Sequence, residues 1–415
     1  MTRRYVKRGS TPCRTAALHA GALVARTGDE MSGPALMLAG LARTGSAAAG
    51  AALLAGITVA AAVGGPLLGA LLDRTARPGR LLATALVLYA AGLTLVLLGL
   101  GRLPFAVSVL LAAVTGLLGP ALSGGWTAQL PLVVPAGGLP RANALDAMTF
   151  GAASLAGPAL AGGTAALLGA PPAVLVSAAL IGAAVPATWL LPARPGAAHG
   201  PRTASVPGDL AAGVRALATR PRLARATLIS VVCCVAQGML TACLPQLGER
   251  VLGGAGRGTA LLSCAAATAL AANALLARFP RAVAPDTVLW TTPLIQASAH
   301  ALAALSPAAS GGPALLVMAA ALTGIAEGPA LTALFAVRHR EAPARLRGQI
   351  FTTGASLKIT AFALGATLAA ALSPRSLPLA LTLSATTAAA ATLLFFALPA
   401  SAHRDTVSPS TADGR

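Results

Sequence analysis

The sequence predicts an all-α integral membrane protein with twelve membrane-spanning helices in two pseudo-symmetric six-helix bundles. Its 415 residues are 56% hydrophobic and only 10% charged, whereas a soluble domain carries roughly 25% charged residues. Apolar runs of about 20 residues, the length that crosses a hydrocarbon core of about 30 Å, recur along the whole chain. Basic residues concentrate in alternate loops between these runs. The chain therefore cannot cover a water-facing surface, and we expect lipid around it.

Each predicted helix is an apolar run bounded by Arg, Pro or Gly. A polar stretch at 338–347 separates the tenth run from the eleventh, and we expect a loop there. The approximate ranges are 15–42, 46–72, 80–101, 104–134, 142–169, 171–192, 224–247, 257–277, 286–307, 311–336, 348–372 and 376–399.

The distribution of basic residues predicts the orientation. With the N-terminus inside, 23 of the 30 basic residues fall on the cytoplasmic side and 5 on the outer side. Positively charged loops remain in the cytoplasm, so we expect both termini there. The split also supports the helix count, because the loss of one helix would invert every later loop.

The loops also contain an internal repeat. Residues 69–77 align without gaps with residues 273–281, at an offset close to half the chain. Parallel halves of this kind are typical of membrane transporters. We therefore predict an N-terminal bundle at 1–192, a cytoplasmic linker with an amphipathic helix capped by Asp209 at 193–223, a C-terminal bundle at 224–400 and a disordered tail at 401–415.

Several functional classes are excluded at this stage. The net charge of +19 is spread over short loops with three Trp and two Tyr, which is unlike a nucleic-acid-binding surface. The five cysteines lie mostly inside apolar runs and are expected to be small core residues. No Gly-x-x-x-x-Gly-Lys-Ser/Thr motif occurs, so ATP hydrolysis is not expected. We predict no cofactor and no metal site.

Charged residues inside the predicted spans are the main functional candidates, because charge inside a bilayer is costly. The first span contains Arg26, Asp29 and Glu30, spaced three and four residues apart, so they share one helix face and can pair. Asp29 lies roughly 16 Å along the helix from Leu18, near the membrane centre. A buried structural ion pair that fixes this helix to its neighbours is the alternative interpretation.

The C-terminal half contributes two further charges, Glu327 in the tenth span and Lys358 in the eleventh. The opposite charges of these two residues can neutralise each other if their helices pack together. One carboxylate then remains in excess, and an uncompensated carboxylate in a low dielectric tends to bind a proton. Asp29 or Glu30 is the first candidate for a proton carrier, and Glu327 is the second.

Uncharged polar side chains inside the spans supplement these charges. Such groups more often make helix–helix contacts than bind substrate. The candidates are Trp126, Gln129 and Gln237, with Gln296 and His300 beside them.

The turn between the second and third spans reads Gly69-x-x-x-Asp73-Arg74-x-x-Arg77. It resembles the loop signature of the major facilitator superfamily. The alternative is an ordinary basic cytoplasmic loop. The resemblance implies two six-helix bundles that expose a central site alternately to each side, with Asp73, Arg74 and Arg77 forming a cytoplasmic charge latch.

A second resemblance lies in the fifth span, at Gly157-Pro158 followed by Gly162-Gly163. It is similar to the antiporter motif of drug-exporting members of the superfamily. This chain has one extra residue between the Pro and the Gly pair, and Ala153 replaces an upstream glycine. The small residues still permit close helix packing and a kink.

Together these features predict a bacterial secondary transporter of the cytoplasmic membrane. The expected activity is proton-coupled export of an amphipathic compound or drug, and proton-coupled uptake is the alternative. A polytopic membrane enzyme would need acids or histidines on substantial loops, and the predicted outer loops are short; a non-transporting membrane partner is the remaining class. The expected partners are a small-molecule substrate, protons and the bilayer, and the resemblance implies a monomer that is not an enzyme.

Overall fold

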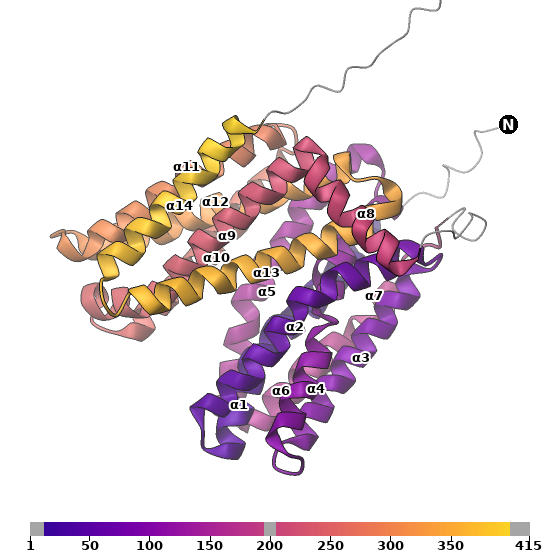
Figure 1. Ribbon diagram of the computed structural model, residues 1–415, viewed down its shortest axis with the longest axis horizontal. Coiled ribbons are helices and arrows are strands. Elements are labelled where there is room, and N and C mark those ends of the chain that lie inside the picture. The colour runs from indigo at the N-terminus through magenta and orange to yellow at the C-terminus, as the bar shows by residue number, and fades with distance from the viewer. Residues whose placement is uncertain (1–11, 195–204, 399–415) are drawn as a thin grey trace, which may run out of the picture.

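A computed structural model describes residues 12–194 and 205–398. Every regular element within these two ranges is helical, and the helices form two bundles (Figure 1). The all-α membrane fold predicted from the sequence is confirmed. The predictions for the N-terminal tail, the Pro/Gly-rich part of the linker and the C-terminal tail fall on 1–11, 195–204 and 399–415, outside the described residues.

The first bundle contains the helices up to residue 188. Within it, α1 packs against α2, α5 and α6, and α4 packs against α2 and α3. The helices are α1 (Pro12–Thr44), α2 (Ala47–Arg74), α3 (Pro78–Gly99), α4 (Phe105–Gly116), α5 (Leu139–Leu168), α6 (Ala170–Ala183) and α7 (Val185–Thr188).

The second bundle repeats this arrangement after a connecting helix, α8 (Val206–Thr219). Ser205 caps α8 by accepting a hydrogen bond from the Gly208 N–H, so the prediction that Asp209 is the cap is wrong. The helices of this bundle are α9 (Pro221–Leu247), α10 (Ala255–Arg278), α11 (Pro285–Leu305), α12 (Gly312–Glu341), α13 (Arg347–Leu372) and α14 (Leu377–Ala397).

Ten helices in the described ranges are long and apolar enough to cross a membrane. They include α6 with α7 as one span and α4 with the turn that follows it. The helices α1 and α11 extend along the bundles as well but are not among these ten. The chain is a multi-pass membrane protein.

The fourth and tenth predicted helices are among those whose ends differ from the structure. The fourth span is helical only to Gly116 and continues as a π-helical turn at Ala121–Gly125, because Pro120 and a series of glycines weaken the regular helix. The tenth continues to Glu341, beyond the predicted end at 336. No Gly or Pro lies between the predicted end and Pro343, and basic side chains favour the last turn of a helix.

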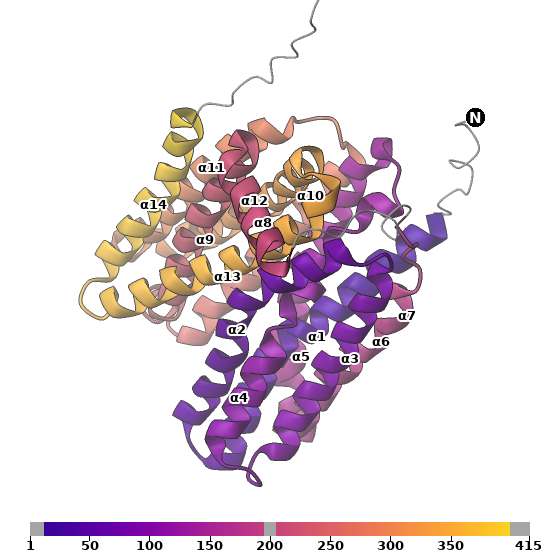
Figure 2. The same cartoon turned by 45° about the vertical axis from the view of Figure 1, so that its right-hand side comes forward.

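The two bundles meet at one end and diverge toward the other (Figures 1 and 2). We call the end formed by α8, the α2–α3 turn and the start of α13 the linker end, and the end formed by the α1–α2 and α13–α14 turns the far end. Contacts between the bundles run from α2 to α13 and from α5 to α10 and α12.

Glycines allow the backbones to approach closely at the linker end. A Cβ on Gly69 of α2 would lie 2.8 Å from the Gln349 backbone nitrogen of α13 and would also overlap Thr352 Oγ1. A Cβ on Gly124 would lie 2.6 Å from the carbonyl carbon of Phe351. Small residues at such crossings are typical of membrane helix interfaces.

Replacing Gly69 with Leu is therefore expected to separate the bundles at the linker end. Spin labels on the exposed positions Arg77 and Ala344 should report a longer distance than in the parent protein, and labels on Arg102 and Arg375 at the far end a shorter one. Pulsed electron–electron double resonance measures the distance between the two labels of each pair. An unchanged linker-end distance in a folded variant would show that the close packing of α2 on α13 at Gly69 does not set the separation of the bundles.

Candidate functional site

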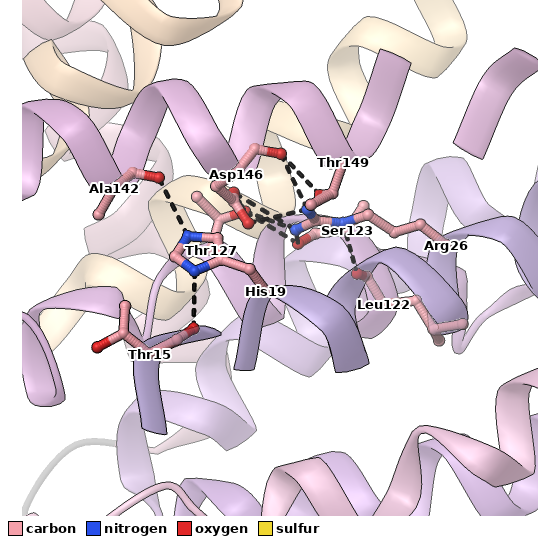
Figure 3. A network of polar contacts seen from close by, with 9 residues as sticks. All are labelled: Thr15, His19, Arg26, Leu122, Ser123, Thr127, Ala142, Asp146 and Thr149. Carbon is pink, nitrogen blue, oxygen red and sulfur yellow. Dashed lines mark hydrogen bonds and ion pairs between the residues drawn. The ribbon is translucent and has the colours of Figure 1, made fainter. Parts of the chain in front are cut away.

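A buried ion pair joins α1 to α5 (Figure 3). Arg26 Nη1 donates to Asp146 Oδ1 at 2.8 Å and also to Thr149 Oγ1. Arg26 Nη2 donates to Thr127 Oγ1 at 2.9 Å, and the Thr127 hydroxyl donates to Asp146 Oδ2 at 2.6 Å. The side chains of Arg26 and Asp146 are only 2% and 0% exposed. The pair is thus closed into a small polar network inside the bundle.

Backbone and aromatic groups complete the surroundings of the guanidinium. Arg26 donates to the carbonyl oxygens of Leu122 and Ser123, each at 3.3 Å. These carbonyls belong to the irregular region after α4, where the π-helical turn changes the regular backbone pairing. The Phe150 ring lies 3.7 Å from the guanidinium carbon, in cation–π geometry.

The predicted pairing of Arg26 with Asp29 or Glu30 is therefore wrong. Asp146 lies four residues after the predicted start of the fifth span, where a charge is inexpensive because water is close. The helix starts earlier, at Leu139, and buries this carboxylate. Sequence spacing alone could identify only partners on the same helix.

The two acids of α1 have different surroundings. Asp29 Oδ1 accepts a hydrogen bond from the Tyr89 hydroxyl at 2.6 Å, and Ser32 Oγ lies 3.1 Å from the same hydroxyl. Glu30 is exposed on α1. Neither acid makes an ion pair with a residue in 12–194 or 205–398. Two adjacent carboxylates thus remain outside any ion pair among the described residues.

The α5 motif lies beside these acids. A Cβ on Gly157 would lie 2.6 Å from Glu30 Cβ, so the glycine allows α5 to cross α1 at this residue. Pro158 lies inside α5. A Cβ on Gly162 would meet nothing within 4 Å. Of the three motif residues named, Gly157 is therefore the one that this packing requires.

Glu327 on α12 and Lys358 on α13 lie close enough for Lys358 to attract the carboxylate electrostatically. They form no ion pair within 4 Å, and neither makes a hydrogen bond to any other described residue. The structure thus places the two charges near each other without direct contact.

Asp73 connects the two bundles at the linker end. Its carboxylate accepts hydrogen bonds from the backbone N–H groups of Gly348 and Gln349, both at 2.8 Å, at the start of α13. A helix N-terminus favours an anion in this position. Arg194 Nη1 lies 3.6 Å from Asp73 Oδ1. Burial lowers the pKa of Arg194, and the charge of Asp73 opposes that shift.

The other basic residues of the loop signature have different neighbours. Arg74 Nε pairs with Asp209 Oδ2 of α8 at 2.6 Å. Arg77 is exposed, and its side chain forms no ion pair within the described ranges. The expectation of one three-residue latch is therefore corrected for Arg77, while the Asp73 carboxylate bonds directly to α13 of the other bundle.

The uncharged candidates mainly make packing contacts. Gln129 Oε1 accepts from Arg194 Nη2 at 2.8 Å, which places it in the linker-end network. Trp126 is 2% exposed and lies in the core of the first bundle. Gln237 Oε1 accepts from Gln296 Nε2 at 3.3 Å, between α9 and α11.

An aromatic contact between the bundles was not predicted. The Phe150 ring of α5 lies 5.7 Å from Phe335 of α12, which lies 5.8 Å from Phe351 of α13. His339 stacks on Phe351 at 4.5 Å. Arg338 is 2% exposed, and two of its guanidinium nitrogens have no hydrogen-bond partner among the described residues. Because the sequence predicted a loop at 338–347, the burial of Arg338 and His339 was not expected.

The family can now be assigned. Residues 18–357 match the model of the Major Facilitator Superfamily. The chain belongs to this superfamily. It is also 27% identical over 292 residues to an uncharacterized MFS-type transporter, y4rN, from Sinorhizobium fredii (strain NBRC 101917 / NGR234), which covers 70% of this chain and 71% of that protein.

Solved structures share the fold. A bacterial homologue of the iron transporter ferroportin, in an outward-facing state, aligns with a TM-score of 0.76 and 15% identity over 93% of this chain and 99% of that one. The human organic anion transporter MFSD10 (TETRAN) aligns with a TM-score of 0.70 and 17% identity over 93% of this chain and all of that one. The family and these structures support membrane transport by this chain.

Breaking the buried pair should destabilise the first bundle. Asp146→Asn leaves the Arg26 charge uncompensated, and losing one partner of a buried pair costs about 3–5 kcal/mol. The midpoint of thermal unfolding in detergent, followed by tryptophan fluorescence, should fall clearly.

Two further variants control this prediction. The double variant Arg26→Met/Asp146→Leu should recover much of the loss, because no buried charge remains. Glu341→Gln, which breaks an exposed pair with Arg222, should cost less than about 1 kcal/mol. An Asp146→Asn protein as stable as the parent would contradict the assigned pairing.

Proposed function

We propose that this protein is a proton-coupled secondary transporter that exports amphipathic compounds by alternating access. The observation that carries the proposal is the pairing of Arg26 with Asp146. Because that pair is internally neutral, Asp29 and Glu30 remain on the same helix without an ion-pair partner within the described ranges.

Such a pair of acids suits proton binding. Two adjacent carboxylates repel each other when both are ionised, and a low-dielectric environment disfavours each charge further. A bound proton removes one charge and makes movement of the bundles less costly. The Tyr89 hydroxyl, 2.6 Å from Asp29, favours the ionised form of that residue, so Glu30 is the first proton acceptor in this scheme and Glu327 serves the second bundle.

The arrangement of the bundles supports alternating access. The linker end is held by the bonds from Asp73 to α13 and by the aromatic contact, while the bundles diverge toward the far end. If the N-terminus is cytoplasmic, this is the conformation open to the outside. Of the two solved structures described above, the one with the higher TM-score was solved in an outward-facing state.

The direction and the substrate class are inferred from weaker features. Export is favoured by the likeness of Gly157-Pro158 to the antiporter motif and by the close packing of Gly157 on Glu30. Movement of protons inward through the same acids would drive the compound outward. An apolar cavity surface with a few charges suits amphipathic molecules.

Removing the carboxylates should uncouple transport from the proton gradient. In proteoliposomes, Glu30→Gln and Asp29→Asn/Glu30→Gln should lose most pH-driven flux of cationic and anionic fluorescent dyes. Exchange of dye between equal concentrations should continue, because it needs no net proton movement. Asp286→Asn, which changes a half-buried acid in the first turn of α11, provides the control. Gradient-driven flux that survives in the double variant would rule out these acids as the coupling site.

Loss of the Asp73 carboxylate should weaken the linker-end contact. In Asp73→Asn, the amide oxygen is a weaker hydrogen-bond acceptor, and the negative charge that the α13 N-terminus favours is lost. We expect slower exchange and gradient-driven transport together, with an unchanged thermal midpoint. Arg77→Gln, in the same turn, should transport normally because its exposed side chain forms no ion pair with another described residue. Equal transport by the Asp73→Asn and parent proteins would contradict the proposed role of Asp73 as a latch.

A further inference from the structure

A groove runs along the outer side of α5, close to the linker end. Its larger part, about 640 Å³, lies between α1 and α5 and is closed on one side by Leu270 of α10. An adjoining cavity of about 250 Å³ lies between α5 and α10. The two cavities share Arg141, Leu145 and Met148. The groove therefore spans the junction of the two bundles.

The groove faces away from the contact between the bundles. On α5, Asp146 and Phe150 point toward Arg26 and toward Phe335. Residues 145, 148 and 152 line the groove, and at about 100° per residue they lie on the opposite side of the helix from Phe150. In a multi-pass membrane protein, that outer side faces the bilayer.

The lining is apolar except at its linker end. Most of the surface comes from aliphatic side chains, with His19 and two threonines between them. No acidic residue lines either cavity.

Two arginines from different bundles lie at the linker end of the groove. Arg141 is at the start of α5 and Arg278 at the end of α10. Both are exposed, and neither makes a hydrogen bond or ion pair with a residue in the described ranges. Arg278 only approaches the neighbouring Phe279 ring, at 5.9 Å. Both guanidinium groups are thus available to an anion.

We propose that this groove binds an anionic phospholipid of the leaflet at the linker end. The phosphate lies between Arg141 and Arg278, which match its geometry with paired N–H donors. An acyl chain follows the apolar surface between α1 and α5. The volume of the larger cavity is within the range of about 300–1,000 Å³ that is typical of small-molecule sites.

The site also has a consequence for conformation. Arg141 moves with the first bundle and Arg278 with the second, so one phosphate can bind both only while the linker end is closed. A ligand that prefers one state shifts the population toward it. The lipid thus stabilises the conformation seen here. This binding does not depend on which direction the protein transports or whether protons drive it.

Lipid retention by the purified full chain tests the proposal. The protein is equilibrated with phosphatidylglycerol or phosphatidylcholine in detergent, and native mass spectrometry measures the bound lipid. The parent should retain phosphatidylglycerol in preference to phosphatidylcholine. Arg141→Gln and Arg278→Gln should each weaken phosphatidylglycerol binding about fivefold, the usual contribution of a basic side chain near an anionic lipid.

Matched variants separate a specific site from general charge attraction. Arg102→Gln/Arg375→Gln removes the same charge from exposed far-end residues and should leave binding unchanged. Ala152→Phe keeps both arginines but fills the groove and should also release the lipid. The proposal is overturned if the two lipids bind equally, if the far-end variant loses as much lipid as Arg141→Gln/Arg278→Gln, or if that double variant binds like the parent.

Discussion

The buried pair of Arg26 with Asp146 determines how charge is distributed in the first bundle. A guanidinium inside a membrane protein must be neutralised and hydrogen-bonded, or its burial would be prohibitive. Two threonines and two backbone carbonyls complete its bonding, at the point where α4 becomes irregular. Because this arginine pairs with Asp146, it forms no ion pair with the acids one turn further along α1. The transport chemistry proposed for Asp29 and Glu30 depends on Arg26 pairing with Asp146 and not with them.

The contacts between the bundles are hydrogen bonds and aromatic contacts that can break and re-form. Asp73 binds backbone N–H groups at a helix start, and the aromatic rings of α5, α12 and α13 meet at tilted angles. Each contact is modest in energy, so no single one locks the arrangement. An anionic lipid across Arg141 and Arg278 would add to them from outside. The membrane itself would then help to set the balance between the two states of the transporter.

The sequence was sufficient for the fold but only partly for the site. Span length and loop charge predicted the helices because the bilayer fixes both, and the loop signature correctly identified Asp73 as a residue of the inter-bundle contact region. Asp146 was missed because its partner is 120 residues away, which no helical spacing reveals. Arg338 and His339 were assigned to a loop because their polarity outweighed the absence of a helix breaker. Long-range pairing thus decided the first of these cases and the local helix boundary the second.

Infrared spectroscopy provides the most direct test of the central claim, that uncompensated acids on α1 carry protons. A protonated carboxyl group has a C=O stretching band that shifts on exchange into D₂O. We predict such a band in the purified protein at neutral pH, and its loss in Asp29→Asn/Glu30→Gln. The absence of the band in the parent protein, or its full retention in the variant, would contradict the account.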